Sequence, residues 1–242
     1  MTKGLINKIL PFSSVDGPGN RTAIFLQGCN FDCLYCHNPE TINYENSLKY
    51  TNGYNPTYMS VEEVLEKIQK TRAFISGITV SGGECTLQAK FLIELFTEAH
   101  KLGLSCFIDT NGSLPLNENE ELVSLIDMAM IDLKSFDSSE HKMLTGVDNS
   151  VVIENINYMA KLNKLYEIRT VIVPDILNNE YNVHMTSSLI ASLNPDIKYK
   201  LIKYRPMGVR LDKVKVTVPN DKYMENLKDI AQNNGCRNVI IV

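Results

Sequence analysis

The sequence predicts an α/β protein built on parallel strands, either a full or partial (β/α) barrel or a doubly wound sheet. Its 242 residues suit one such domain, because α/β barrels of roughly this length often form a single unit. About six short apolar runs rich in β-branched residues alternate with amphipathic segments along the chain. Runs of this kind suit strands that are buried on both faces of a parallel sheet.

The expected elements follow one another in a regular order. Strands are expected over residues 22–26, 77–80, 104–108, 128–133, 168–173 and 199–202, and 239–242 adds a further strand. Helices are expected over residues 61–68, 87–102, 118–126, 151–162, 180–193 and 221–234. Ser60 and Glu63 form a capping box at the first helix, while Gly103 and Gly235 follow the ends of two others.

The domain organisation is expected to be simple. Residues 40–57, rich in Asn and Tyr, are interpreted as a surface loop, because no second hydrophobic core follows them separately. We therefore expect one domain over residues 1–242, with a C-terminal extension from about residue 219.

The composition excludes several classes of protein. With 44% hydrophobic and 21% charged residues, the chain is neither disordered nor collagen-like nor a small disulfide scaffold. A net charge of −4 argues against a nucleic-acid binder, which is usually basic. There is no apolar run near 18 residues and no signal peptide in residues 1–9, so we expect a cytoplasmic protein without a membrane span.

Three of the six cysteines crowd into eight residues, at Cys29, Cys33 and Cys36. This spacing lets one loop wrap three thiolates around a metal centre. Structural zinc needs a fourth ligand, and His37 directly follows Cys36, which is an awkward geometry for sharing one ion. Three thiolates suit a four-iron, four-sulfur (4Fe–4S) cluster with one open iron, while a zinc site or unrelated core thiols are the alternatives. Three scattered cysteines are interpreted as small buried hydrophobes: Cys85, Cys106 and Cys236.

The spacing Cys-x3-Cys-x2-Cys, with Tyr35 before the last cysteine, resembles the radical S-adenosylmethionine (radical SAM) superfamily. More closely, residues 15–21, 25–29 and 36–39 are similar to the glycyl-radical enzyme activating enzymes, a family that includes the pyruvate formate-lyase activating enzymes. The resemblance continues through residues 81–84, 109–112, 132–134 and 169–174, and the YjjW-type branch is the most similar.

This resemblance implies a fold and an activity. The fold is a partial (β/α)6 TIM-like barrel of the radical SAM type. Cys29, Cys33 and Cys36 ligate one 4Fe–4S cluster, and S-adenosylmethionine binds its open iron. Reductive cleavage gives a 5′-deoxyadenosyl radical, which abstracts the α-hydrogen of a glycine in a partner glycyl-radical enzyme. A radical enzyme for a small molecule or nucleotide, or a non-catalytic metal-binding or electron-carrying module, is the alternative.

The resemblance also implies roles for single residues. The cofactor-binding positions are Tyr35, Cys36, His37, Gly82, Gly83, Glu84, Asp109, Asp132, Leu133, Lys134, Arg169 and Arg205. A monovalent cation, Na⁺ or K⁺, is held by Asp109, Thr110 and the carbonyl of Met130. The turn that meets the substrate protein contains Asp16, Gly17, Pro18, Gly19 and Arg21.

Several of these positions also allow a structural interpretation. Tyr35 can be a packing aromatic, and the Asp16–Arg21 turn can lack a ligand role. Asp132 and Lys134 share a strand face and can form a plain salt bridge. Arg169 lies in an apolar strand and needs an anionic or polar partner.

The chain departs from the family pattern at two places that affect function. Residues 38–59 contain no cysteine, so the ferredoxin-like insert of many activating enzymes is absent and one cluster is expected. We therefore expect an external flavodoxin or ferredoxin to supply electrons to this cluster. We also expect the protein to be a monomer. Arg205 stands where pyruvate formate-lyase activating enzymes have a cofactor-contacting histidine. Seven basic residues between 198 and 215 form either a solvated face or a docking rim for the partner.

Overall fold

The computed structural model describes residues 2–43 and 55–242, so most of the loop expected over 40–57 lies outside the described residues. The chain forms two compact units that are interleaved in sequence. The first comprises Met1–Asn30, Glu40–Thr110 and Leu116–Met130; the second comprises Phe31–Pro39, Asn111–Pro115 and Ile131–Val242. The single domain over 1–242 stays a prediction.

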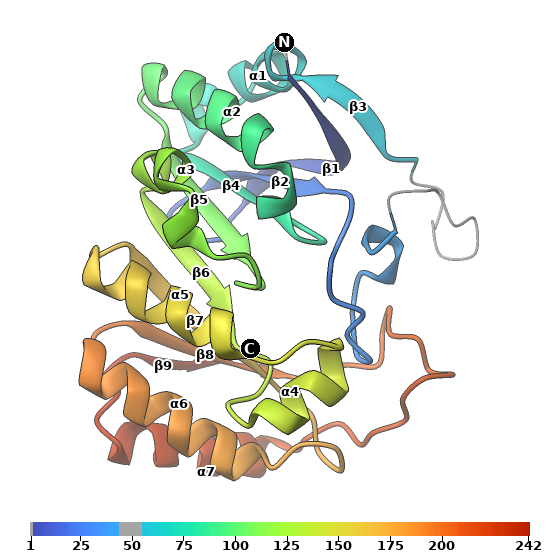
Figure 1. Cartoon of the computed structure of the whole chain (residues 1–242), viewed down its shortest axis with the longest axis vertical. Coiled ribbons are helices and arrows are strands. Elements are labelled where there is room, and N and C mark those ends of the chain that lie inside the picture. Colours follow the sequence, from blue (N-terminus) through green and yellow to red (C-terminus); the bar gives the residue numbers. More distant parts are fainter. Residues whose placement is uncertain (1, 44–54) are drawn as a thin grey trace. The chain divides into compact units, whose positions relative to one another are not determined.

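The first unit is built on a sheet with the strand order β3-β1-β2-β4-β5 (Figure 1). The strands are β1 (Lys3–Ser13), β2 (Arg21–Leu26), β3 (Thr57–Ser60), β4 (Gly77–Gly82) and β5 (Ser105–Thr110). β2, β4 and β5 are mutually parallel, whereas β1 pairs antiparallel with both β2 and β3. The parallel strands therefore end at one common edge.

Three helices belong to this unit: α1 (Val61–Gln69), α2 (Ala89–Lys101) and α3 (Glu120–Leu125). Short 3-10 turns occur at Pro39–Thr41, Arg72–Phe74, Cys85–Gln88 and Leu116–Glu118. α2 packs against α1 and α3 (Figure 1). The expected capping box forms at α1, because the Ser60 hydroxyl accepts from the Glu63 amide while the Glu63 carboxylate accepts from the Ser60 amide.

The second unit continues the strand order as β6-β7-β8-β9. Its strands are β6 (Met128–Asp132), whose residues divide between the two units, β7 (Leu165–Ile172), β8 (Lys198–Lys203) and β9 (Val239–Ile241). β7, β8 and β9 are parallel. The helices are α4 (Ser138–Thr145), α5 (Ser150–Lys161), α6 (Asn179–Leu193) and α7 (Asp221–Asn233).

The expected parallel strands and their helices are confirmed, with ends displaced by a few residues. Three elements were missed: β1, β3 and α4. β1 was missed because polar residues break its apolar pattern, and its pairing with β2 contains register shifts. α4 is short, yet Asp137 caps its start through the Glu140 amide and Gly146 ends it with φ +90°. Among the described residues, no helix is both long and apolar enough to cross a membrane.

Candidate functional site

In the first unit, the predicted site residues gather where parallel strands end. Cys29 follows β2, Gly82 and Gly83 end β4, and Asp109 and Thr110 end β5. Leu26 and Gly82 are paired in register across β2 and β4, so both strands end at the same level. The carboxyl edge of a parallel sheet is where α/β proteins bind ligands.

The backbone around Cys29 is fixed from two sides. The amides of Gly28 and Cys29 donate to the carbonyls of Thr41 (2.8 Å) and Ile42 (2.9 Å). The Glu84 amide donates to the Gly28 carbonyl at 2.7 Å. The first expected cluster ligand is therefore held against the end of β4.

Gly82 and Gly83 leave no room for a side chain. A Cβ atom on Gly83 would lie 2.1 Å from the Gly28 carbonyl oxygen, and one on Gly82 would lie 2.2 Å from the Leu26 oxygen. Gly82 also has φ +135°, which L-residues rarely adopt. The glycine pair lets two stretches of the chain's own backbone meet directly, and the Gly83 amide donates to the Leu26 carbonyl at 3.1 Å.

The carboxylates at this edge are held by hydroxyl and amide groups. Glu84 is fully buried, and its Oε1 accepts from the Thr86 amide (3.0 Å), the Thr86 hydroxyl (2.6 Å) and the Thr110 hydroxyl (2.7 Å). Asp109 accepts from the Ser81 hydroxyl at 3.1 Å. Of the predicted cation ligands, Thr110 therefore uses its hydroxyl proton toward Glu84. Met130 is buried on β6.

The scattered cysteines are buried, as expected. Cys85 lies 3.5 Å from the Asp109 carbonyl oxygen, and burial raises the pKa of its thiol, with Glu84 and Asp109 adding to the rise. Cys236 is buried in the second unit, where burial raises its pKa to about 11. A thiol with a raised pKa stays protonated and unreactive at neutral pH, which agrees with a role in packing.

The Asp16–Arg21 turn precedes β2 and packs against β4, where the Thr79 hydroxyl donates to the Asp16 carbonyl at 2.6 Å. Its anchor is the buried Arg21, which donates to the Thr79 hydroxyl (2.8 Å) and the Ile78 carbonyl (2.7 Å) and covers the Phe107 ring at 3.9 Å. These contacts hold the turn rigidly, and its Asp16 end lies beside Thr79, roughly 10 Å along β4 from Gly82 at about 3.3 Å per residue.

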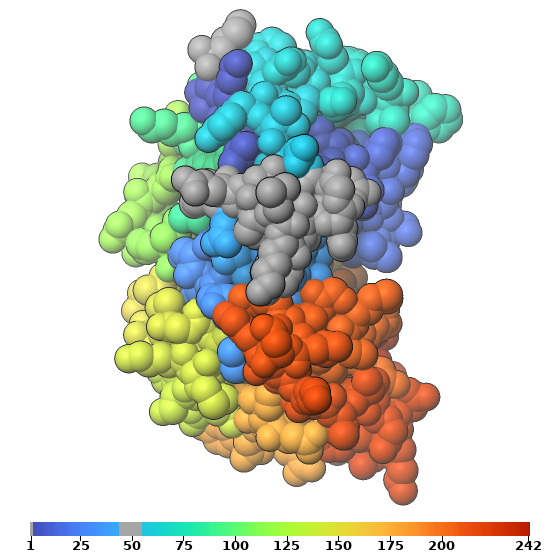
Figure 2. All heavy atoms as spheres, turned by 90° about the vertical axis from the view of Figure 1, so that its right-hand side faces the viewer, coloured from blue at the N-terminus to red at the C-terminus, as the bar shows by residue number. Residues whose placement is uncertain are grey.

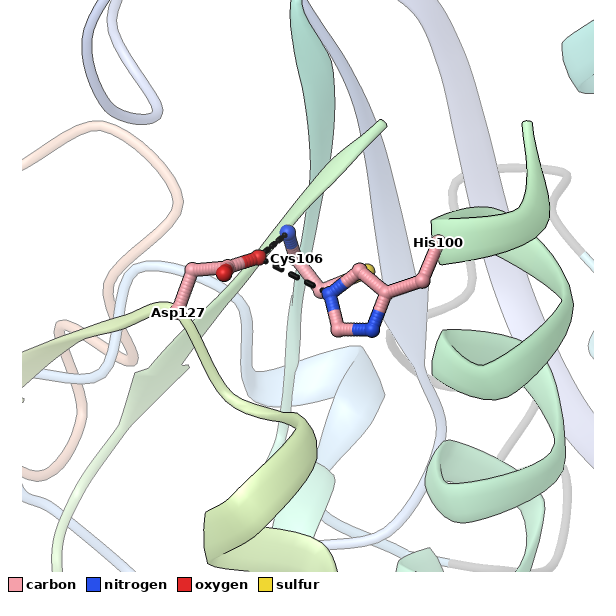
Figure 3. A group of neighbouring side chains, drawn as sticks. All are labelled: His100, Cys106 and Asp127. Atoms are coloured by element: carbon pink, nitrogen blue, oxygen red, sulfur yellow. Dashed lines mark hydrogen bonds and ion pairs between the residues drawn. The ribbon is translucent and has the colours of Figure 1, made fainter. Parts of the chain in front are cut away.

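A second group of potential ligand side chains, His100, Cys106 and Asp127, lies near the start of β5 (Figure 3). Asp127 Oδ2 accepts from the Cys106 amide at 2.6 Å and lies 3.0 Å from His100 Nε2. Burial, together with the charge of Asp127, raises the pKa of the Cys106 thiol, whose sulfur faces the carbonyls of Phe96 and Leu104. The carboxylate oxygen that a metal would need is already engaged, so we interpret the group as a structural contact.

In the second unit, the cluster loop (Phe31–Pro39) rests on the end of α4. The amides of Asp32 and Leu34 donate to the carbonyls of Thr145 (3.3 Å) and Leu144 (3.1 Å). These carbonyls belong to the last turn of α4, where no amide of the helix itself is available to donate to them. A turn from the Cys36 amide to the Cys33 carbonyl (3.1 Å) then sets the spacing of the second and third expected ligands.

Tyr35 is packed in an apolar cluster of this unit with Val171, Val173 and Tyr204. It is 2% exposed, and among the described residues its hydroxyl has no hydrogen-bond partner. Burial raises the pKa of this phenol, against an opposing contribution from Lys134. The structural interpretation of Tyr35 as a packing aromatic therefore holds, and its contact with a cofactor stays a prediction.

His37 and Arg205 meet through a hydrogen bond from His37 Nε2 to the Arg205 carbonyl at 2.9 Å. Burial lowers the pKa of His37, so the ring is neutral at physiological pH. The Arg205 side chain is exposed.

Asp132 and Lys134 form the salt bridge that their spacing allows, with Lys134 Nζ 2.6 Å from Asp132 Oδ2. Burial tends to raise the pKa of Asp132, but Lys134 and Arg169 outweigh it and the net shift is downward. Burial likewise opposes the charge on Lys134, and Asp132 outweighs it, so the Lys134 pKa is raised. Both groups are charged at neutral pH. Leu133 between them is fully buried.

Glu167 is a buried carboxylate that the sequence analysis missed. It is 1% exposed and binds Arg169 Nε (2.5 Å) and Lys200 Nζ (2.8 Å), with Lys198 Nζ 3.9 Å away. The required partner of Arg169 is thus Glu167, two positions earlier on the same face of β7. The spacing of two residues on one strand was the signal in the sequence that could have revealed this ion pair.

Within the part of the chain that the structure describes, most of the basic residues between 198 and 215 have acidic partners. Lys198 and Lys200 pair with Glu167, and Lys203 pairs with Asp221 at 2.6 Å. The run is therefore mainly an internal set of ion pairs, rather than a uniformly solvated face.

The chemistry of the three cysteine donors fits an iron–sulfur cluster. All six cysteines lie among the described residues, and these form no disulfide. Cys29 belongs to the first unit and Cys33 and Cys36 to the second, and each backbone is fixed by its own hydrogen bonds.

Comparison with known proteins identifies the family. The model of the radical SAM superfamily matches residues 23–185. The chain is 30% identical over 260 residues to a putative glycyl-radical enzyme activating enzyme of Haemophilus influenzae, covering 98% of this chain and 96% of the relative. It is 31% identical to pyruvate formate-lyase 1-activating enzyme of Escherichia coli K12, over 96% of each chain.

Solved structures show the same fold. A domain of a pyruvate-formate lyase-activating enzyme from Bacteroides vulgatus matches with a TM-score of 0.59 at 24% identity. The match covers 69% of this chain and 99% of that chain. QueE from Escherichia coli matches with a TM-score of 0.61 at 17% identity, over 99% of this chain and 94% of QueE. The expected radical SAM partial barrel is thereby confirmed, and the chain belongs to the radical SAM superfamily and, within it, to the glycyl-radical enzyme activating enzymes.

Proposed function

We propose that this chain generates a radical on a glycine of a partner glycyl-radical enzyme, using S-adenosylmethionine and one 4Fe–4S cluster on Cys29, Cys33 and Cys36. The observation that carries this proposal is the backbone of Cys29 fixed beside Gly83 at the carboxyl edge of β2 and β4. The relatives named as activating enzymes, matched over nearly the whole chain, support it.

Each set of residues has a proposed task. When bound, the cluster supplies the electron that cleaves a carbon–sulfur bond of S-adenosylmethionine, and the nucleoside radical takes the glycine hydrogen. Gly82 and Gly83 offer backbone groups to the amino acid part of the nucleoside. Asp132 and Lys134, both charged and mostly buried, hold its polar groups in one orientation.

The finer assignments are also proposals. Asp109, Thr110 and the Met130 carbonyl hold a monovalent cation, and the rigid turn before β2 contacts the backbone of the partner protein. A flavodoxin or ferredoxin donates the electron, because residues 38–59 hold no cysteine for a second cluster. The chain acts as a monomer in the cytoplasm, where its thiols stay reduced.

The experiment is anaerobic reconstitution with iron and sulfide, followed by S-adenosylmethionine, a reductant and candidate glycyl-radical proteins. We expect a glycine-centred doublet by electron paramagnetic resonance (EPR). Cys33→Ala abolishes cluster binding and cofactor cleavage, whereas the matched Cys236→Ala retains both. Equal loss in the two variants contradicts the ligand assignment. Cofactor cleavage that a small molecule stimulates, without a doublet on any partner, favours the small-molecule alternative.

A further inference from the structure

The segment between β8 and α7 folds back onto the cluster loop. We call its residues Arg205–Val216 the strap; it forms an orange part of the surface in Figure 2. Two of its apolar residues, Val209 and Val214, are buried in the same apolar cluster as Tyr35. The strap is therefore packed against the loop that carries Cys33 and Cys36, in the same unit.

The backbone of the strap approaches the cluster loop closely. Gly208 has φ +83°, and a Cβ there would lie 2.5 Å from the His37 carbonyl oxygen. His37 Nε2 donates to the Arg205 carbonyl at 2.9 Å. The register between strap and loop is therefore fixed by contacts that tolerate little displacement.

Charged groups join the strap to the loop next to Cys33. Arg210 Nη2 lies 2.5 Å from Asp32 Oδ1 and donates to the Cys33 carbonyl at 2.9 Å. Lys213 Nζ lies 2.7 Å from Asp32 Oδ2. Two cations thus share one carboxylate, and the group has one unbalanced positive charge.

Arg210 has further capacity to donate. Its side chain is 8% exposed, and among the described residues its Nε has no hydrogen-bond partner. A buried guanidinium N–H without an acceptor is costly, since nearly all such groups are paired. The guanidinium holds the backbone of a residue whose sulfur is an expected cluster ligand, and a thiolate or inorganic sulfide would be a suitable acceptor. Hydrogen bonds and charges around such sulfurs set the reduction potential of a cluster.

We propose that Arg210 is a positioning residue for Cys33 and that its charge, partly balanced by Asp32, raises the reduction potential of the cluster. This inference rests on the proposed function, because it requires a cluster on Cys33. A nearby positive charge favours the reduced form, which is more negative by one electron. The external donor supplies that electron, so a higher potential makes the transfer easier.

The test is a potentiometric titration of the reconstituted holoenzyme, followed by EPR of the reduced cluster. Arg210→Gln removes the positive charge, and we expect the midpoint potential to become more negative. Asp32→Asn removes the opposing charge, and we expect a shift in the other direction. Lys213→Gln should shift the potential in the same direction as Arg210→Gln but less, because this side chain is 37% exposed and better screened.

Two further variants separate charge from structure. Arg210→Lys keeps the charge, so it should restore most of the potential even where cluster binding is weakened about tenfold by the lost hydrogen bonds. Arg237→Gln, which removes a 69% exposed arginine paired with Asp196, is the control and should leave the potential unchanged.

Shifts of the same sign in Arg210→Gln and Asp32→Asn, or no shift in either, overturn the inference while the proposed function stands. If the wild-type protein binds neither iron nor sulfide after reconstitution, the proposed function itself is overturned. The two failures are therefore distinguishable.

Discussion

In the first unit, the residues at the ends of β4 and β5 are held by backbone contacts and by hydroxyl and amide groups, as at Gly83 and Glu84. In the second unit, the predicted site residues are held by ion pairs, at Asp132–Lys134 by the end of β6 and at Arg169 with Glu167 within β7. Steric fit and neutral donors depend little on pH or salt, whereas buried charges depend on every partner being present. The two halves of the predicted site should therefore fail in different ways.

The steric contact in the first unit gives the largest expected effect. Gly83→Ala places a Cβ 2.1 Å from the Gly28 carbonyl oxygen, and neither backbone can yield without breaking the bonds that hold Cys29. We expect a loss of more than about 4 kcal/mol in the free energy of unfolding, measured by urea denaturation.

Gly146→Ala is the matched control for this change. Gly146 has φ +90°, but a Cβ there meets nothing within 4 Å, so only conformational strain of about 1 kcal/mol is expected. If the two variants lose equal stability, close approach of the backbone is not what Gly83 provides.

The ion pairs of the second unit give an intermediate effect. Glu167→Gln leaves Arg169 and Lys200 without their carboxylate in a buried place, and we expect a loss of about 3 kcal/mol in unfolding free energy. Glu225→Gln breaks an exposed pair with Lys228 and should change stability by less than about 0.5 kcal/mol. A Glu167→Gln loss that disappears in high salt would show that the Glu167 group is solvated after all.

The sequence predicted the local part of this comparison well. Asp132 and Lys134 are two positions apart on one strand, so their salt bridge follows from strand geometry. Glu167 and Arg169 have the same spacing on β7, so strand geometry alone is enough to predict their ion pair. The glycines at the end of β4 were expected only as cofactor-binding positions, and their contact with the Gly28 backbone was not predicted.

Contacts between distant segments could not be predicted in this way. Asp32 and Lys213 are 181 residues apart, and no periodicity relates the strap to the cluster loop. The loop also needs the last carbonyls of α4, a helix of eight residues that is too short to give a clear apolar periodicity. Propensity indicates which elements form, but tertiary packing decides which helix end receives a loop.

The smallest expected effect is a pH dependence that distinguishes the two units through His141 on α4. This side chain is fully buried, its Nδ1 donates to the Val147 carbonyl at 2.8 Å, and among the described residues its Nε2 has no partner. Burial, assisted by the charge of Lys134, lowers the pKa of His141 below its usual value. In the unfolded chain the ring takes up a proton near pH 6.5, so below that pH the unfolded state binds more protons and stability falls.

Above about pH 6.5 the contribution of neutral His141 is fully present, and it is lost as the pH falls toward the pKa of the folded state. Because α4 carries the cluster loop, we expect the amides of Asp32 and Leu34 to exchange hydrogen faster at pH 5.5 than at pH 7.5, after correction for intrinsic rates. The amides of Gly28 and Cys29, bonded only to backbone in the first unit, should show no such change. A His141→Gln variant should lose this difference between the two pairs of amides; if it persists there, titration of another group governs the loop.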